Sequence, residues 1–299
     1  MGNGATSAVR LDHVTKRYGA VLALDAIQLD IHAGEFVALL GPNGAGKTTA
    51  ISLMLGLRAP TDGSVQLLGG RPTDRAIRRR CGVMLQDSGL PPMLRVGEVV
   101  RLFRAHYPHP RTVEAVLRLA DLWTKRDRRV DALSGGERQR LNYAIAIAGD
   151  PEVLFLDEPT VGMDVAARHA FYAQLRELSG SGRTIVLTTH YLEEADRLAN
   201  RVVVIDHGRV IVDGTPGEIK ARVPAKKVAL AAGRALTVVD FAGLPVEGLA
   251  LHDHSASFLS NDAVAVVSAL IRHDVPLKDL EVTGAALEDA FLALTERKA

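Results

Sequence analysis

One glycine-rich segment constrains this chain more than any other feature. It reads Gly41-Pro42-Asn43-Gly44-Ala45-Gly46-Lys47-Thr48-Thr49 and lies between the continuous apolar run Phe36–Leu40 and a helix-like stretch that continues to Leu57. Glycines let successive backbone N–H groups converge on one point, and a helix that follows adds the positive end of its dipole. The segment therefore predicts a phosphate-binding loop, the alternative being a glycine turn without a ligand.

Two side chains in this loop carry the chemistry expected of a nucleotide site. The Lys47 ammonium is predicted to reach the terminal phosphates, and the Thr48 hydroxyl is predicted to be a ligand of Mg²⁺. ATP and Mg²⁺ are therefore the expected ligands.

The rest of the core has the pattern of alternating strands and helices. Four short runs are continuously apolar apart from the two terminal threonines of one, which is typical of strands covered on both faces in a parallel sheet: Phe36–Leu40, Val153–Leu156, Thr184–Thr188 and Val202–Ile205. Two others, Ile27–Ile31 and Val65–Leu67, alternate apolar and polar residues, which predicts half-buried antiparallel strands. Helical faces fall between the apolar runs, as in Ala167, Phe171, Leu175 and Leu178 or in Leu192, Ala195 and Leu198. This alternation predicts an α/β core.

Polar residues follow the buried runs, at the edge where α/β sheets bind ligands. Asp157 is predicted to hold a hydrated Mg²⁺ near Thr48, and Glu158 to orient or deprotonate the attacking water. The alternative for both is a loop acid that caps the next helix. His190 follows Thr184–Thr188 and is predicted to contact the γ-phosphate and that water, whereas a histidine taken alone is more often structural.

Two further side chains are candidates for contact with the nucleotide. Gln86 follows the apolar run Val83–Leu85, where its amide is predicted to sense the γ-phosphate or Mg²⁺, although a lone glutamine establishes nothing. Tyr18 lies upstream of the glycine loop and is predicted to stack on adenine, with core packing as the alternative.

A helical insert and a separate tail complete the pattern. Between Gln86 and Ser134 the sequence becomes helical, which predicts an inserted subdomain over about residues 87–140; one stripe holds Val113, Val116, Leu117 and Ala120. Motifs become sparse beyond Arg222, so we predict a first domain over residues 1–222 and a small mixed domain over residues 223–299. That tail ends in an amphipathic helix with Leu287, Phe291 and Leu294 on its stripe.

A second anion site is predicted at Leu133-Ser134-Gly135-Gly136-Glu137, shortly before the strand that ends in Asp157 and Glu158. A serine hydroxyl and small residues at the start of a helix expose N–H groups to a phosphate. This pentapeptide resembles the signature of ABC transporter ATP-binding proteins, and it separates the chain from kinases and GTPases. The resemblance runs from about Val9 to Thr215, with these residues in the family's order: Tyr18, Gly41–Thr49, Gln86, Ser134–Gly136, Asp157, Glu158, Asp164 and His190.

The resemblance implies a fold and a mode of action. The fold is α/β, a P-loop NTPase core with an N-terminal antiparallel β subdomain, the inserted α-helical subdomain and a small C-terminal α+β domain. Two subunits would pair head to tail around two ATP, each ATP lying between the Lys47 loop of one and the Ser134 loop of the other. Hydrolysis would open the pair and drive a separate transmembrane permease.

The resemblance also implies a role for each site residue. Glu158 and His190 would be catalytic. ATP would be bound by Tyr18, Gly41, Pro42, Asn43, Gly44, Ala45, Gly46, Lys47, Thr48, Thr49, Gln86, Ser134, Gly135 and Gly136. Mg²⁺ would be held by Thr48, Gln86 and Asp157.

Two departures from the family's pattern, together with the tail, indicate to which branch of the family the chain is similar. Met163 stands where Leu is commoner, a volume-conserving change, and Ile145 stands where Arg is often seen, which weakens an assignment to the importer branches. The tail segment Ala286–Leu292 resembles that of the drug-resistance (daunorubicin-type) exporter ATPases. It implies export of a drug-like or hydrophobic substrate, with an importer ATPase as the alternative.

Composition limits the other classes of protein that this chain could belong to. The 299 residues are 47 % hydrophobic and 24 % charged with a net charge of +1, which is typical of a globular protein and shows no basic excess for a nucleic acid. No run approaches the roughly 18 apolar residues of a membrane span, and the lone Cys81 fits a reducing cytosol. We therefore predict a cytoplasmic protein, peripheral on the inner face of the membrane and without a span of its own. A soluble ATPase of this type acting on nucleic acid or the ribosome stays the alternative from another class.

Overall fold

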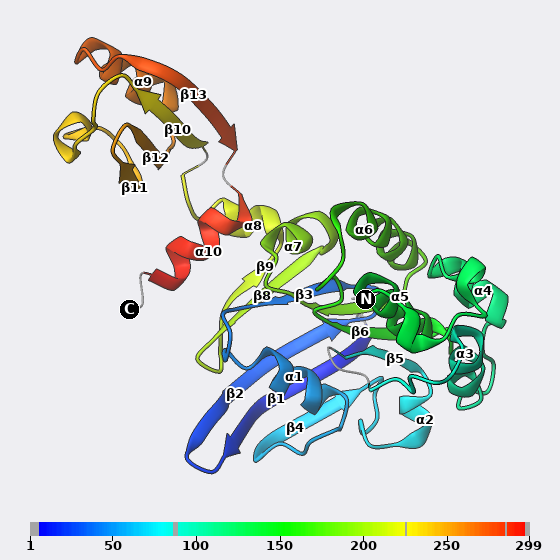
Figure 1. The fold of residues 1–299 in the computed structure, drawn as a ribbon. Coiled ribbons are helices and arrows are strands. Elements are labelled where there is room, and N and C mark those ends of the chain that lie inside the picture. Colours follow the sequence, from blue (N-terminus) through cyan, green and yellow to red (C-terminus); the bar gives the residue numbers. More distant parts are fainter. Residues whose placement is uncertain (1–5, 86–88, 225, 285, 297–299) are drawn as a thin grey trace. The chain divides into compact units, whose positions relative to one another are not determined.

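The computed structural model describes residues 6–85, 89–224, 226–284 and 286–296, and the chain divides into two units, Met1–Asp213 and Gly214–Ala299 (Figure 1). Each unit has its own apolar core. The division falls after Asp213, before the predicted boundary at Arg222. The two domains over residues 1–222 and 223–299 stay a prediction.

A three-stranded antiparallel sheet opens the first unit. Its strands lie in the order β2-β1-β4 and comprise β1 (Ser7–Tyr18), β2 (Val21–His32) and β4 (Asp62–Leu67). Val9 of β1 lies opposite Ile31 of β2 and Leu67 of β4, and all three side chains are buried. The alternating pattern of Ile27–Ile31 and Val65–Leu67 thus puts one face of each strand into the core, and the predicted antiparallel subdomain is confirmed.

The central sheet has six strands in the order β5-β6-β7-β3-β8-β9. They are β3 (Phe36–Leu40), β5 (Cys81–Met84), β6 (Val153–Asp157), β7 (Thr184–Thr188), β8 (Arg201–Asp206) and β9 (Arg209–Gly214). The strands from β5 to β8 in this order pair in parallel, and every residue of β3, β6 and β7 is buried. The continuous apolar runs therefore form the predicted parallel core, with β9 added at one edge.

Helices cover this sheet on both faces. Figure 1 shows α1 between the central sheet and the antiparallel sheet, and α6 and α7 on the opposite side of the central sheet. The buried Ala50, Ile51 and Met54 of α1 belong to a core cluster that includes residues of β1, β2 and β3. The helices of this unit are α1 (Lys47–Met54), α2 (Arg75–Arg78), α3 (Val96–Arg104), α4 (Val113–Leu119), α5 (Gly135–Ile147), α6 (Val165–Gly180) and α7 (Leu192–Leu198), with 3₁₀ turns at Trp123–Lys125 and Val130–Ala132.

The inserted helical part is built as the stripe predicts. Thr112 caps α4 by accepting a hydrogen bond from the Ala115 N–H at 3.1 Å. Val116, Leu117 and Ala120 are fully buried. Asp164 caps α6 in the same way, with 2.8 Å from the Ala167 N–H to its carboxylate.

The second unit is a four-stranded antiparallel sheet with one covering helix. The strand order is β11-β12-β10-β13, and the core joins Val228 and Phe258 of the sheet to Val266 and Leu270 of α9. Its elements are α8 (Pro216–Lys220), β10 (Lys226–Ala232), a 3₁₀ turn at Val238–Phe241, β11 (Glu247–His252), β12 (Ser255–Ser260), α9 (Ala263–Arg272), β13 (Leu277–Gly284) and α10 (Leu287–Glu296). The predicted α+β class of the tail is confirmed.

Within the described ranges, no helix combines the length and the apolar character that crossing a bilayer requires.

Candidate functional site

The glycine loop turns directly from a buried strand into a helix. Strand β3 ends at Leu40 and α1 begins at Lys47. Gly41 and Gly46 both have positive φ, at 152° and 110°. A Cβ at Gly46 would lie 2.7 Å from the Ala23 carbonyl oxygen, and one at Gly41 would lie 2.0 Å from that of Ile205. Only glycine fits at either position, so at these two points the loop packs against β2 and β8 with its backbone alone.

The start of α1 is open to an anion. Gly46 occupies the N-cap position, and no side chain in the described part of the chain caps this helix. The backbone N–H groups of the first turn therefore lack the acceptor that a serine or aspartate cap supplies. Together with the positive end of the helix dipole, they form a site for a phosphate.

Lys47 is held at the base of this loop. Its Nζ donates to the carbonyl oxygens of Gly41, at 2.7 Å, and Pro42, at 3.0 Å, and the residue is only 7 % exposed. Burial lowers the pKa of the Lys47 ammonium, while the nearby carboxyl groups of Glu158 and Asp157 act in the opposite direction. An ammonium held by two carbonyl dipoles in a buried place is well prepared to receive an anionic ligand.

A cavity of about 590 Å³ surrounds this loop. Its volume lies within the range of small-molecule sites, roughly 300–1,000 Å³. The lining consists of Val21, Leu22, Ala23, Gly41, Pro42, Asn43, Gly44, Ala45, Gly46, Lys47, Thr48, Thr49, Glu158 and His190. The predicted loop, the predicted water-activating acid and the predicted histidine thus share one cavity.

Asp157 and Glu158 end strand β6 in different environments. Asp157 is 4 % exposed and accepts a hydrogen bond from the Thr188 hydroxyl. Burial raises the pKa of the Asp157 carboxyl, and the neighbouring Glu158 adds to this, while Thr188 and Lys47 oppose it. Glu158 has a backbone φ of 48°, which is unusual for a residue other than glycine. Its N–H donates to the Thr188 carbonyl at 3.0 Å. Thr188 therefore fixes both acids.

Glu158 and His190 face each other. The Oε1 atom of Glu158 lies 3.4 Å from Nδ1 of His190, and the two side chains are 17 % and 44 % exposed. An acid and an imidazole beside Lys47 are suited to hold one water and one phosphate oxygen between them. The roles predicted for these residues stay predictions, but the geometry brings the side chains together.

A magnesium ion fits the donors present here. Thr48 supplies a hydroxyl in the cavity, and Asp157 is a buried carboxylate at the end of strand β6. Over the residues that the structure describes, no three His, Cys, Asp or Glu side chains cluster so as to hold a metal by themselves. Mg²⁺ usually takes one or two protein ligands and completes its shell with phosphate oxygens and water, so this sparse set fits it.

Ser134 is not among the residues that line the Lys47 cavity. It is the N-cap of α5, where its Oγ accepts from the Glu137 N–H at 3.2 Å and its own N–H donates to Glu137 Oε2 at 2.9 Å. Glu137 is held in turn by Lys125 and by Arg128, 3.5 Å away. The ammonium of Lys125 lowers the pKa of the Glu137 carboxyl. Within one chain, the predicted second anion site is thus a closed capping box.

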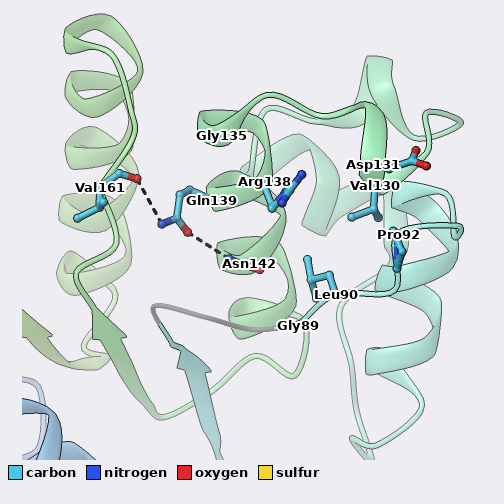
Figure 2. Close-up of a pocket in the computed structure, with 10 residues that line it drawn as sticks. All are labelled: Gly89, Leu90, Pro92, Val130, Asp131, Gly135, Arg138, Gln139, Asn142 and Val161. Atoms are coloured by element: carbon cyan, nitrogen blue, oxygen red, sulfur yellow. Dashed lines mark hydrogen bonds between the residues drawn. The ribbon is translucent and has the colours of Figure 1, made fainter.

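A second cavity, of about 450 Å³, lies along α5. Figure 2 shows Arg138 and Gln139 on α5, with Val161 on one side of this helix and Val130 on the other. Gln139 Nε2 donates to the Val161 carbonyl at 3.3 Å. This bond ties the helix that begins after Ser134 to the loop that follows Glu158.

Two predicted nucleotide contacts fall outside this arrangement. Tyr18 is 38 % exposed, which excludes core packing. Lys16 Nζ lies 5.1 Å and Arg58 Cζ 5.3 Å from the centroid of its ring. It is not among the lining residues of the Lys47 cavity, and its stacking on adenine stays a prediction. Gln86 lies outside the described residues.

Sequence reasoning missed Thr188 as a site residue. It is fully buried, and it bonds both Asp157 and the backbone of Glu158. The available signal was a hydroxyl at the end of the buried strand that precedes His190. Sequence reasoning also missed Val21, Leu22 and Ala23, the first residues of β2, which line the same cavity. A strand pattern does not show that the start of a strand will lie beside the glycine loop after a strand of another sheet.

Comparison with known proteins gives consistent matches. The protein-family model described as "ABC transporter" matches residues 24–161. The Nod factor export ATP-binding protein I of Paraburkholderia xenovorans LB400 is 36 % identical, over 98 % of each chain. The protein of the same name from Cupriavidus pinatubonensis JMP 134 is 42 % identical, over 72 % of this chain and 68 % of that one.

Solved structures match about 70 % of the chain. An ATP-binding subunit of an ABC transporter superposes with a TM-score of 0.67 at 28 % identity, covering 72 % of this chain and 93 % of that one. An ATP-binding cassette solved as a dimer in a post-hydrolysis state, with ADP and Pi bound, superposes with a TM-score of 0.64 at 29 % identity. That match covers 69 % of this chain and 98 % of the other.

Proposed function

The chain belongs to the ABC transporter family of ATP-binding proteins, and from this we propose that it is the motor of an exporter. It is an ATPase of the ABC type. A relative named for Nod factor export is similar over 98 % of both chains, tail included, which supports export over import. This likeness agrees with the exporter-type tail that the sequence predicts.

One observation carries the proposal for the chemistry: Glu158 lies 3.4 Å from His190 at the cavity that also contains Lys47. In this proposal the Lys47 ammonium turns from its two carbonyl partners to the terminal phosphates of ATP. Glu158 accepts the proton of a water that attacks the γ-phosphorus, and the bond from that phosphorus to the ADP oxygen breaks. His190 holds the γ-phosphate and that water in line.

Mg²⁺ would be held by Thr48 and Asp157, with Gln86 as the third predicted ligand. When bound, the ion neutralises charge that builds up on the phosphate oxygens during transfer. The buried position of Asp157 suits this role, because a cation compensates a carboxylate that burial otherwise disfavours.

We further propose that two copies pair around two ATP. Ser134, Gly135 and Gly136 would contact the γ-phosphate held by the Lys47 loop of the second copy. The known dimer of a similar cassette with ADP and Pi supports this pairing. Loss of the γ-phosphate would then remove the contact that holds the pair closed.

The partner of this motor would be a separate transmembrane permease, with the chain peripheral on the cytoplasmic face of the membrane. The cargo would be a drug-like or hydrophobic molecule, selected by the permease. No nucleic acid is expected as a partner.

Affinity purification of the tagged chain from its own cells in mild detergent, followed by mass spectrometry, tests the partner. We expect a multi-helix membrane protein that is absent from a parallel purification with untagged cells. Recovery of ribosomal or DNA-bound proteins in its place would contradict the transporter role and leave the ATPase chemistry intact. Recovery of a permease together with a periplasmic binding protein would contradict export.

A further inference from the structure

A buried acid outside the predicted site links its two loops. Glu194 lies in the first turn of α7 and is 0 % exposed. Two hydroxyl groups donate to its Oε1 atom, that of Thr160 and that of Tyr172, the latter at 3.1 Å. Its Oε2 atom makes no hydrogen bond to any described residue.

The partners of Glu194 come from the segments that carry the proposed chemistry. Thr160 is two residues beyond Glu158, and Glu194 is four residues beyond His190. Thr160 is 1 % exposed, so its hydroxyl has no water to replace this bond. Glu194 therefore connects the loop after β6 to the helix after β7, directly behind the residues that face the cavity.

The neighbouring Glu193 shows what an ordinary acid does on this helix. Its side chain is 61 % exposed and pairs with Arg197 at 2.9 Å, one turn along. Glu194 has no such surface role. Burying a carboxyl costs free energy that packing alone does not require, since an apolar side chain would fill the same space. The buried acid is explained by the two hydroxyl groups that it holds.

The same loop is held from the other side by Thr188. That hydroxyl donates to Asp157, and the Glu158 N–H donates to the Thr188 carbonyl at 3.0 Å. Thr188 precedes His190 and Glu194 follows it, so one fixing contact lies on each side of the histidine. The separation between Glu158 and His190 is thereby determined at two points.

Helix α6 braces the histidine as well. The guanidinium of Arg168 lies 4.6 Å from the Tyr191 ring centroid, and that ring lies 4.1 Å from the ring of His190. Tyr172, which bonds Glu194, is one turn beyond Arg168 on the same helix. The network around Glu194 therefore has a rigid element behind it.

We propose that Glu194 is a positioning residue for ATP hydrolysis. By holding Thr160, it keeps Glu158 at the distance from His190 that in-line attack by water requires. It touches neither the nucleotide nor the water. The inference rests on the proposed roles of Glu158 and His190.

Three substitutions and one matched control test this role. Glu194→Ala and Thr160→Val each remove the bond between the loops, and each is expected to lower kcat by about ten- to a hundredfold with the KM for ATP nearly unchanged, because a small misplacement costs that much. Glu194→Gln keeps an acceptor oxygen and is expected to retain most of the turnover. Glu193→Ala, on the exposed face of the same turn, is expected to leave kcat unchanged.

The double variant Thr160→Val with Glu194→Ala separates positioning from general stability. Two residues that act through one bond are non-additive, so the double variant should lose little more kcat than either single one. Additive losses, or a lower unfolding temperature with unchanged kcat, would assign Glu194 a structural role only. If Glu194→Ala does not fold, Thr160→Val and Glu194→Gln still decide the question.

Glu158→Gln, measured in the same preparations, tells the two failures apart. If it abolishes turnover while Thr160→Val does not affect kcat, the positioning role is wrong and the proposed site stands. If Glu158→Gln hydrolyses ATP normally, the proposed site is wrong and the inference fails with it.

Discussion

Two helix N-termini in this chain are predicted to meet phosphate, and they are built differently. The start of α1 follows a glycine loop, has no side-chain cap and carries Lys47 in its first turn. The start of α5 is closed by the reciprocal bonds of Ser134 and Glu137, and a carboxylate lies in its first turn. Each helix has the positive end of its dipole at this terminus, but only α1 has backbone N–H groups without a side-chain acceptor beside a positive charge.

The difference indicates an order of events. The α1 terminus offers an ammonium and unclaimed N–H groups, so it can bind ATP within one chain. At α5 the Glu137 N–H is already taken, and the Glu137 carboxylate already pairs with the nearby cations Lys125 and Arg128, which could otherwise attract a free anion. In the proposed dimer, its remaining donors would gain from a phosphate only when the second copy presents one that lysine and Mg²⁺ already neutralise. The α5 terminus would then contact a nucleotide bound to the other copy and would not capture one itself.

The largest expected effect comes from trapping the state in which both termini meet one nucleotide. Glu158→Gln removes the proposed proton acceptor and keeps the side-chain shape, so turnover is expected to fall by about 10²- to 10⁴-fold while ATP still binds. Closed dimers should then accumulate with ATP, measured by light scattering after size exclusion. The same variant with ADP is the control and should stay monomeric. Unchanged turnover would remove Glu158 from this role.

The next test separates ATP binding at the α1 terminus from contact with a bound ATP at the α5 terminus. Lys47→Ala removes a charged contact to phosphate, which is worth about 1.5–3 kcal/mol, and is expected to weaken ATP binding by roughly ten- to a hundredfold. Equilibrium binding of a fluorescent ATP analogue measures this on the isolated chain. Because burial disfavours the Lys47 ammonium, the unliganded variant should not unfold at a much lower temperature. Binding at wild-type affinity would show that the loop is misread.

Ser134 tests the other terminus, with two replacements that differ only as helix caps. Alanine costs about 1 kcal/mol at an N-cap and glycine only a few tenths, but both lose the hydroxyl. We expect both variants to bind ATP normally as isolated chains and to lose about tenfold in ATP-driven dimerisation and turnover. If Ser134→Ala is impaired and Ser134→Gly behaves as wild type, Ser134 serves the helix alone.

Much of this architecture could be predicted because local signals agree with the final fold. The run Phe36–Leu40 is apolar throughout and is buried throughout as β3. Position 46 requires glycine because its φ is positive and the Ala23 carbonyl lies too close for a Cβ. A glycine-rich loop between a strand and a helix implies such a position. Such features depend on residues that are near one another in sequence.

The missed features depend on contacts between segments that are distant in the sequence. Asp157 and Thr188 are paired across β6 and β7, and Thr160 meets Glu194 thirty-four residues away. A hydrophobic pattern identifies each strand but does not say which residue of one lies beside which residue of the next. The side-chain bonds that fix the acids were therefore invisible until the sheet was assembled.

The smallest expected effect concerns the charge that only the α5 terminus carries. Because Lys125 lowers the pKa of Glu137 in the folded chain, this acid stabilises the fold above about pH 4.5, its ordinary pKa, and the contribution is lost as the pH falls through the lowered value. Glu137→Gln should therefore cost about 1 kcal/mol near neutral pH and progressively less below pH 4.5. Urea unfolding of both proteins across that range measures the difference.

The exposed acid Glu114, paired with Arg118 one turn along α4, is the control for this measurement. Glu114→Gln is expected to cost only about 0.3 kcal/mol, because an exposed pair of this spacing contributes little. If Glu137→Gln costs no more than this control, the capping box does not hold Glu137 as a charged group. The difference in charge between the α5 and α1 termini would then be smaller than we infer, and the contrast would rest on the Ser134 cap and on Lys47 alone.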